Sequence, residues 1–260
     1  MEFQLLEILK TILKNSFLGP FLGRLKSAQL KYVNFKIRYD QDGFITTHYP
    51  YFQEDKRFIE ALKYNSSFDE IQKKALTHDW RIFILCSFAF NAIKSGDGDL
   101  IECGVFRGDC AKTILRYCNL NSTNKYFYLL DSFDGFDASQ LTRNEKNLRN
   151  EGQFRGVLEF VKKKFIDDNC IKIIEGFVPN TFNQIKSKKF CFAHIDMNAS
   201  YPEKKALEYI YPRLKDGGVI IFDDYGHAGH EEQRVVLDEV VKKFDRVIIC
   251  LPTGQGLLIK

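Results

Sequence analysis

The sequence lacks the features that mark disulfide-stapled, membrane-spanning or nucleic-acid-binding proteins. Its seven cysteines form no CxxC pair and several lie in apolar runs, so neither a disulfide framework nor a zinc site is expected. Lysine plus arginine exceed aspartate plus glutamate by only 38 to 34 and are scattered, which argues against a nucleic-acid partner. The longest apolar stretch, residues 82–93, is too short to span a bilayer. We expect a cytoplasmic protein without a transmembrane segment.

The N-terminal residues carry a helical pattern and no cleavage-type export signal. Residues 5–13 place leucine and isoleucine at helical spacing, with Lys10 and Lys14 on the opposite side, until Gly19 and Pro20 interrupt the pattern. We expect this helix to pack on its own domain or on a second subunit rather than on a membrane surface. Packing on a second subunit would make the protein a homodimer.

The remaining chain divides into two segments of different pattern. Residues 1–75 are rich in aromatic residues, with turn signals at Asp42-Gly43 and Tyr49-Pro50, and contain no repeated strand unit. We predict that they form an N-terminal extension that acts as a cap. Residues 76–260 are ample for one α/β domain with a large core.

Short apolar runs alternate with helical patterns after the break at residues 95–98. The predicted strands are residues 100–103, 126–130, 171–174, 190–195, 219–222, 247–251 and 256–260. The predicted helices are residues 80–93, 111–118, 154–165, 180–186, 203–213 and 231–244. Such alternation indicates a parallel sheet with helices on both faces.

The connection between the last two strands distinguishes two versions of that sheet. Pro252, Thr253 and Gly254 leave no room for a helical crossover, so the final pair must be an antiparallel hairpin. We therefore predict an α/β fold with a doubly wound, mostly parallel seven-stranded sheet, a C-terminal antiparallel hairpin and an N-terminal helical and aromatic extension. This arrangement resembles the class I S-adenosylmethionine (SAM) methyltransferase fold more than a nicotinamide-binding fold.

The first strand of the domain leads into the stretch ECGVFRGDC. Gly104 and Gly108 let the loop bend and let a ligand approach the backbone. Their spacing is GxxxG, so the GxGxxG fingerprint for a dinucleotide pyrophosphate is absent. Glu102 would repel phosphate but would suit a ligand that carries a cation, such as the amino group and sulfonium of SAM. The alternative for Glu102 is a surface or capped carboxylate.

Other carboxylates follow the later strands. Asp131 ends the second strand, where it could accept both hydroxyls of a ribose or could cap a helix. Asp196 and the pair Asp223-Asp224 follow two neighbouring strands, so they should converge on one cleft. Because paired acids are costly unless a cation binds them, and Mg²⁺ prefers oxygen ligands, the sequence predicts a metal site there. The alternative is that Asp223-Asp224 merely caps the next segment.

Three stretches in this order resemble the macrocin O-methyltransferase family, whose members methylate sugar hydroxyls of macrolide antibiotics. They are DGDLIECGVFRGDCAKTIL, YLLDSFDGF and FAHIDMNASYPEKKALEYIYPRLKDGGVIIFDDYG, and the similarity covers residues 80–226 and, more loosely, the C-terminal LPTGQGLLIK. The resemblance implies a class I fold, SAM as methyl donor, a divalent metal that is usually Mg²⁺, and a small-molecule hydroxylated acceptor. Carried onto this chain, it implies SAM contacts at Glu102, Gly104, Gly108, Asp131 and Ser132, and a metal held by Asp196, Asp223 and Asp224.

One departure from that pattern concerns the base. Antibiotic-type members commonly have Asp-x-Asp where this chain has Asp-Met-Asn over residues 196–198. Asn198 offers an amide oxygen but no charge and no basicity, so Asp196 is the favoured base or shared ligand. His227 and His230 are further candidates for the catalytic base, whereas His194 lies in an apolar strand and is expected in the core.

Three aromatic residues complete the candidate set. Trp80, the sole tryptophan, could stack in the cofactor or acceptor pocket, with core packing as the alternative. Tyr201 and Tyr225 are expected to line the acceptor side.

The favoured function is a SAM-dependent, Mg-assisted O-methyltransferase acting on a hydroxyl of a sugar or glycosylated small molecule. The alternative is a non-catalytic relative that binds SAM or a nucleotide and serves as a scaffold in glycan or secondary-metabolite assembly, which Asn198 favours. A nicotinamide-dependent oxidoreductase is disfavoured by the glycine spacing and the terminal hairpin.

Overall fold

The computed structural model describes residues 36–64, 78–149 and 153–260 and divides the chain into two compact units, residues 1–50 and 51–260. In the first unit, β1 (Tyr39–Gln41) and β2 (Phe44–Thr46) form an antiparallel hairpin. Its turn is the predicted Asp42-Gly43, where the φ angles of 53° and 70° suit a tight hairpin turn. The helix predicted over residues 5–13 and the predicted boundary at residue 75 lie outside the described ranges.

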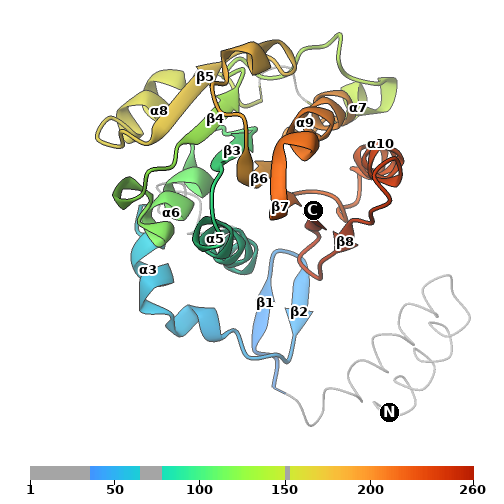
Figure 1. The fold of residues 1–260 in the computed structure, drawn as a ribbon. Coiled ribbons are helices and arrows are strands. Elements are labelled where there is room, and N and C mark those ends of the chain that lie inside the picture. The colour runs from blue at the N-terminus through green and yellow to red at the C-terminus, as the bar shows by residue number, and fades with distance from the viewer. Residues whose placement is uncertain (1–35, 65–77, 150–152) are drawn as a thin grey trace, which may run out of the picture. The chain divides into compact units, whose positions relative to one another are not determined.

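The second unit contains a seven-stranded sheet of order β5-β4-β3-β6-β7-β9-β8 (Figure 1). Its strands are β3 (Asp99–Cys103), β4 (Phe127–Asp131), β5 (Ile171–Glu175), β6 (Phe190–Ile195), β7 (Leu214–Phe222), β8 (Ile249–Cys250) and β9 (Gly256–Ile259). Strands β3 to β7 pair in parallel, and β9 pairs antiparallel with both β7 and β8. The predicted mostly parallel sheet with a C-terminal hairpin is confirmed.

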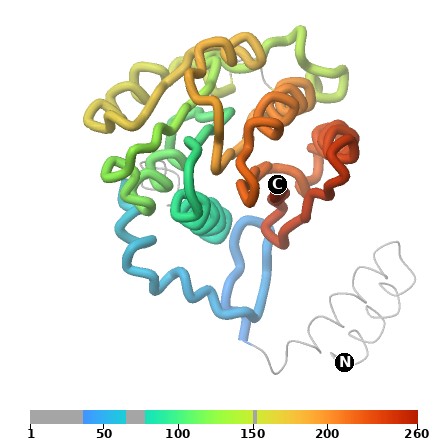
Figure 2. Tube along the Cα trace, viewed as in Figure 1, coloured from blue at the N-terminus to red at the C-terminus, as the bar shows by residue number. Residues whose placement is uncertain are grey.

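The turn of the C-terminal hairpin lies at the carboxyl end of β7, where the start of β9 pairs with Phe222. The last strand, β9, lies inside the sheet between β7 and β8. The C-terminus that follows it lies beside the orange segment that contains β7 (Figure 2). The turn before β9 is closed by the Leu251 amide, which donates to the Gln255 carbonyl over 2.8 Å. Gln255 is fully buried, and its side-chain amide donates to Asp223 Oδ1 over 3.1 Å. The hairpin therefore helps to position an acid at the end of β7.

Helices cover both faces of this sheet (Figure 1). On one face, α5 (Asp79–Lys94) packs against α6 (Asp109–Cys118) and crosses β6 and β7; on the other, α9 (Ser200–Arg213) packs against α10 (Glu231–Lys242). The shorter helices are α3 (Lys56–Leu62), α7 (Arg143–Leu148) and α8 (Leu158–Lys164), with 3₁₀ turns η1 (Tyr51–Glu54), η2 (Leu120–Ser122) and η3 (Asn180–Gln184). In the part of the chain that the structure describes, no helix combines the length and the apolar character needed to cross a bilayer.

Aromatic side chains join the start of the second unit to its core. Phe52 is stacked on Phe83 of α5 with ring centroids 5.2 Å apart, and Phe58 of α3 meets Phe83 edge to face at the same distance. Trp80 packs edge to face on Phe52 at 5.1 Å. Phe52 and Phe58 are both fully buried, so these residues belong to the core of the domain.

The central strands contain buried polar residues that a purely structural core would not need. Strands β3 and β6 are buried on both faces, as a parallel sheet between helix layers requires. Glu102 of β3 and His194 of β6 are paired in register across the two strands, and each is 1% exposed. Since buried carboxylates are rare unless paired, this position marks a site rather than a packing layer.

Candidate active site

A cavity of about 400 Å³ opens beyond the carboxyl ends of β3, β4, β6 and β7. Strand order reverses between β3 and β6, which is where doubly wound sheets bind their ligands. The predicted residues that line it are Glu102, Gly104, Asp131, Ser132, Asp196, Asn198, Asp223 and Asp224, together with Arg81 and the apolar Phe106, Phe136, Phe154, Phe177 and Met197. The structure therefore brings the three predicted metal residues into one cavity with four of the predicted cofactor residues, whereas Gly108 and Trp80 do not line it.

The two glycines of the first loop are needed for different reasons. Gly104 has φ +87°, and a Cβ there would lie 1.8 Å from the Asp196 carbonyl oxygen, so the loop after β3 touches the backbone after β6. Gly108 has φ +72° and is the N-cap residue of α6, and a Cβ there would lie 2.6 Å from the Phe165 ring. Gly104 lines the cavity, whereas Gly108 does not and is needed because its backbone packs against Phe165.

Asp131 fixes the loops that surround the cavity. Its Oδ2 accepts the backbone N–H groups of Val105 and Phe106 over 2.7 and 2.8 Å, and its Oδ1 accepts that of Phe133 over 2.6 Å. Ser132 continues this role, because its hydroxyl donates to the Gly135 carbonyl over 2.7 Å. The carboxylate predicted to bind a ribose thus also orders the loops after β3 and β4.

An aromatic cluster forms part of the cavity wall. Phe154 meets Phe106 edge to face at 5.0 Å and Phe136 at 5.7 Å. Phe106 and Phe154 have positive φ angles of 46° and 68°, a conformation that side-chain-bearing residues rarely adopt and that gathers at functional sites. The cavity therefore combines an apolar wall with an acidic floor.

Glu102 lies on that floor and forms a buried pair with His194, which does not itself line the cavity. His194 Nδ1 lies 2.7 Å from Glu102 Oε1, and its Nε2 lies 3.5 Å from Asp223 Oδ1. Burial by itself lowers the pKa of His194, but the neighbouring carboxylates of Asp223 and Glu102 outweigh it and raise the pKa to about 10. Glu102 Oε2 and His194 Nε2 have no hydrogen-bond partner among residues 36–64, 78–149 and 153–260. His194 is thus buried as expected, yet it also connects the cofactor end of the cavity to the acid pair.

The acids after β6 and β7 lie close enough to share a cation. One donor atom from each of His194, Asp196 and Asp223 falls within 4.8 Å of the others. Burial raises the pKa of Asp196 well above its usual range, and the charges of Asp223 and Asp224 raise it further. The carboxylate oxygens of Asp196 and Asp223 fit a small divalent cation, whereas His194 would have to release its proton before its nitrogen could become a ligand.

Arg81, from the first turn of α5, is a site residue that the sequence did not indicate. Its Nη1 donates to Asp223 Oδ2 over 2.6 Å and lies 3.8 Å from Asp224 Oδ1. Burial would raise the pKa of Asp223, but the charges of Arg81 and His194 hold it well below its usual range. Arg81 and Asp223 are separated by 142 positions, so only the fold brings them together.

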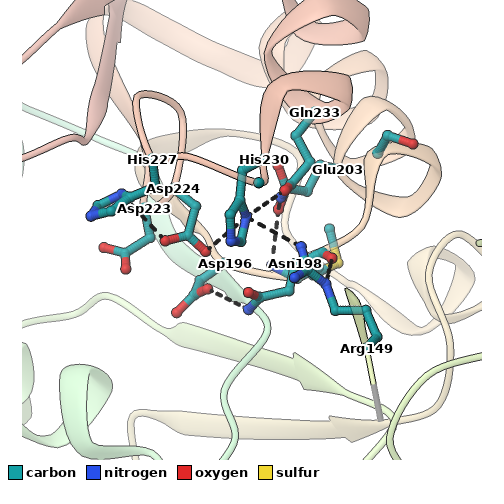
Figure 3. Close-up of polar contacts among 12 residues, drawn as sticks. Arg149, Asp196, Asn198, Glu203, Asp223, Asp224, His227, His230 and Gln233 are labelled. Carbon is teal, nitrogen blue, oxygen red and sulfur yellow. Dashed lines mark hydrogen bonds and ion pairs between the residues drawn. The ribbon is translucent and has the colours of Figure 1, made fainter. Parts of the chain in front are cut away.

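The two candidate histidines flank Asp224 (Figure 3). Asp224 Oδ1 lies 3.5 Å from His227 Nδ1, and its Oδ2 lies 3.4 Å from His230 Nδ1. His227 Nε2 lies 2.8 Å from Arg81 Nη2, and His230 Nδ1 lies 2.6 Å from Gln233 Oε1. Both rings therefore lie beside Asp224, although neither lines the cavity itself.

Asn198 holds the neighbouring acid in place. Its side-chain amide donates to Asp196 Oδ1 over 3.0 Å, and its own carbonyl accepts from Arg149 Nε over 2.8 Å (Figure 3). Behind this loop, buried Glu203 accepts the Met197 N–H over 3.2 Å, and burial raises the pKa of Glu203 to about 8. Asn198 thus donates a hydrogen bond to Asp196, at the position where antibiotic-type family members commonly have a second aspartate.

The three predicted aromatic site residues do not line the cavity. Trp80 packs on Phe52, as described above. The Tyr225 hydroxyl donates to Asp238 Oδ1 over 2.6 Å, and Tyr201 is 41% exposed, with Lys205 over its ring. Their suggested ligand contacts stay predictions.

Known proteins resemble this chain in sequence and in fold. The family described as Macrocin-O-methyltransferase (TylF) matches residues 4–239. The 8-demethyl-8-(2,3-dimethoxy-alpha-L-rhamnosyl)-tetracenomycin-C 4'-O-methyltransferase of Streptomyces olivaceus is 27% identical over 49% of this chain and 53% of its own length. The mycinamicin III 3''-O-methyltransferase of Micromonospora griseorubida is 26% identical over 58% of this chain and 68% of its own length.

Two solved structures share the fold. The O-methyltransferase NovP superposes with a TM-score of 0.61 at 21% identity, over 69% of this chain and 79% of its own. A calicheamicin methyltransferase superposes with a TM-score of 0.58 at 16% identity, over 85% of this chain and 96% of its own. The chain matches about half of the length of the first curated relative.

Proposed function

This chain belongs to the macrocin O-methyltransferase family, and from that membership we propose that it transfers the methyl group of SAM to a hydroxyl of a sugar or glycosylated small molecule. One observation carries the proposal: a single cavity joins Glu102 and Asp131, at the ends of β3 and β4, to the acids that follow β6 and β7. The first pair suits a cationic, ribose-bearing donor, and the second suits an acceptor hydroxyl.

In this proposal, the cofactor lies over the loop after β3. Asp131 accepts the ribose hydroxyls while it continues to hold the loop through the Val105 and Phe106 amides. Gly104 leaves the backbone open to the ligand. Glu102 presents a buried Oε2 without a partner in the described ranges, which suits the cationic part of SAM. Ser132 shapes the adjoining loop.

We further propose that Asp196, Asp223 and Asp224 hold Mg²⁺, with His194 beside them. A divalent cation there would lower the pKa of an acceptor hydroxyl that it coordinates. The support is the donor set itself: buried Asp223 lies beside half-buried Asp196 and Asp224, and desolvation together with the charges of the other two acids raises the pKa of Asp196. Carboxylates that lie this close together repel each other, and a bound cation would offset that repulsion.

The chain's own contribution is alignment and proton transfer. Methyl transfer forms a carbon–oxygen bond as the carbon–sulfur bond breaks in line, and the hydroxyl proton must pass to a base. Holding both partners in line can supply roughly 7–11 kcal/mol of the barrier. Asp196 is the proposed base, because it lines the cavity beside the acids that follow β7 and its neighbour Asn198 cannot accept a proton. His227 and His230, on either side of Asp224, are the remaining candidates.

The proposed acceptor is a sugar hydroxyl because both curated relatives are named for methylation of glycosylated compounds. A scaffold that binds SAM without turnover is the second candidate, and the neutral Asn198 beside Asp196 favours it. The deciding experiment incubates the protein with methyl-labelled SAM and a panel of glycosides, with and without excess chelator. Label in a glycoside supports the enzyme, and loss of label with chelator supports the metal. SAM binding without transfer to any glycoside would favour the scaffold.

A further inference from the structure

We propose that Arg81 is the internal counter-ion of the acid pair at the end of β7, and that a metal ion must displace it to bind. The inference rests on the proposed metal role of Asp223 and Asp224. Arg81 Nη1 is 2.6 Å from Asp223 and 3.8 Å from Asp224, so its charge lies where a cation would lie. The side chains involved are only 11–15% exposed, which leaves little solvent to screen that charge.

The oxygens of Asp223 are already engaged by the protein. Its Oδ2 accepts from Arg81, and its Oδ1 accepts from Gln255 over 3.1 Å with His194 Nε2 at 3.5 Å. A guanidinium is always protonated and can only donate, so it cannot become a ligand. A divalent cation on the same oxygens would meet this positive charge at close range. Its binding therefore requires the Arg81 side chain to move away.

Arg81 also forms a hydrogen bond with Nε2 of His227, one of the candidate bases. Arg81 Nη2 lies 2.8 Å from His227 Nε2, and because Arg81 must donate, Nε2 must carry the lone pair. The ring proton then belongs on Nδ1, which lies 3.5 Å from Asp224 Oδ1. Displacement of Arg81 frees His227 Nε2. Movement of the Arg81 side chain would thus both open the metal site and leave the lone pair of His227 Nε2 free.

The first test measures the affinity for Mn²⁺ alone by calorimetry in the wild type, Arg81→Gln and Lys94→Gln. Lys94 is an exposed cation in the last turn of the same helix, so its variant loses equal charge away from the site. We expect Arg81→Gln to bind Mn²⁺ at least tenfold more tightly than wild type, with Lys94→Gln unchanged. Equal or weaker binding by Arg81→Gln would overturn the proposal.

The second test uses only the wild-type protein, so it does not depend on the variant folding. Diethyl pyrocarbonate modifies imidazole nitrogens that carry a free lone pair, and peptide mass spectrometry gives the rate at each histidine. We expect Mg²⁺ to accelerate modification of His227 severalfold relative to exposed His48. An unchanged ratio contradicts displacement of Arg81. If neither wild type nor Arg81→Gln binds Mn²⁺, the metal role and this inference both fail, whereas SAM binding in the same samples still tests the methyltransferase proposal.

Discussion

At the scale of single residues, Asp223 connects more parts of the site than its position after a strand would indicate. It contacts Arg81 of α5, His194 of β6 and Gln255 of the C-terminal hairpin. Asp223→Asn keeps the shape but removes the charge, so we expect the rate of methyl transfer to fall by roughly 100-fold or more while SAM affinity stays nearly unchanged. Labelled-methyl transfer and calorimetry measure the two quantities.

A control on the same strand separates this effect from a general loss of charge. Asp216 also lies in β7 but is exposed, so Asp216→Asn should retain the wild-type rate. Wild-type turnover in Asp223→Asn would remove this residue from the proposed chemistry.

His194 should make the stability of the protein depend on pH above neutrality. Its pKa is raised from 6.5 to about 10 in the folded state, so the folded protein holds a proton that the unfolded chain releases above pH 6.5. The stability that this proton contributes is complete below pH 6.5 and is lost as pH rises to about 10. We expect the free energy of unfolding to fall by up to about 1.4 kcal/mol per pH unit in that window, and the slope to flatten in His194→Gln. Urea unfolding from pH 6 to 10 measures both; parallel curves would contradict the charged imidazole.

The sequence indicated the residue types of the site but not their contacts. Asp196, Asp223 and Asp224 follow strands whose carboxyl ends share an edge, so their convergence could be inferred from strand order. Arg81 could not be found in this way, because nothing in a helix turn reveals an ion pair across 142 positions. His194 was expected in the core, and its burial is correct, but the register that sets it opposite Glu102 depends on which strands pair.

At the scale of elements, Gly104 decides how closely the loop after β3 can approach the loop after β6. A Cβ at this position would overlap the Asp196 carbonyl at 1.8 Å, which involves backbone on both sides and cannot be relieved by a side-chain rotation. We expect Gly104→Ala to lower the free energy of unfolding by about 3 kcal/mol or more and to weaken SAM binding.

Gly156 provides the matched control for this substitution. It has a similar positive φ of +72°, but no atom of the described residues lies within 4 Å of the point that a Cβ would occupy. Gly156→Ala should therefore cost only the backbone term, roughly 1–2 kcal/mol. Chemical unfolding measures both variants, and equal losses would mean that the close approach to Asp196 is not what requires glycine.

Element boundaries show where local pattern is sufficient and where tertiary contacts decide. The buried strand β6 has the bounds predicted from its continuous apolar run. The helix predicted to begin at residue 154 begins at Leu158, because Phe154 has a positive φ and packs on Phe106 and Phe136. Helix α7 was not predicted: it is short and polar, and a capping box between Thr142 and Glu145 marks its start. The helix predicted over residues 180–186 is the 3₁₀ turn η3, and α3 lies in a segment for which no helix was predicted. Apolar periodicity therefore detects the long helices that face the core and misses short ones.

At the scale of the whole molecule, occupation of the cavity should stabilise the folded state, because a ligand that binds only the native protein shifts unfolding by mass action. At about 100 times the dissociation constant, SAM should add roughly 2.7 kcal/mol, which corresponds to a rise in Tm of about 5–10 °C for a domain of this size. Asp131→Ala should lose most of this rise, since it removes both the proposed ribose acceptor and the anchor of the Val105 and Phe106 amides.

The controls for this experiment also test the choice of cofactor. NAD should give no shift, because a pyrophosphate would face Glu102 and Asp131 without the GxGxxG loop that would receive it. Ser132→Ala removes two loop hydrogen bonds but no carboxylate, so it should keep most of the SAM shift. A shift with NAD and none with SAM would contradict the donor, whereas a full SAM shift in Asp131→Ala would show that the ribose lies elsewhere. The cofactor assignment therefore depends on the acids at the ends of β3 and β4 acting together, not on the fold that many dinucleotide enzymes share.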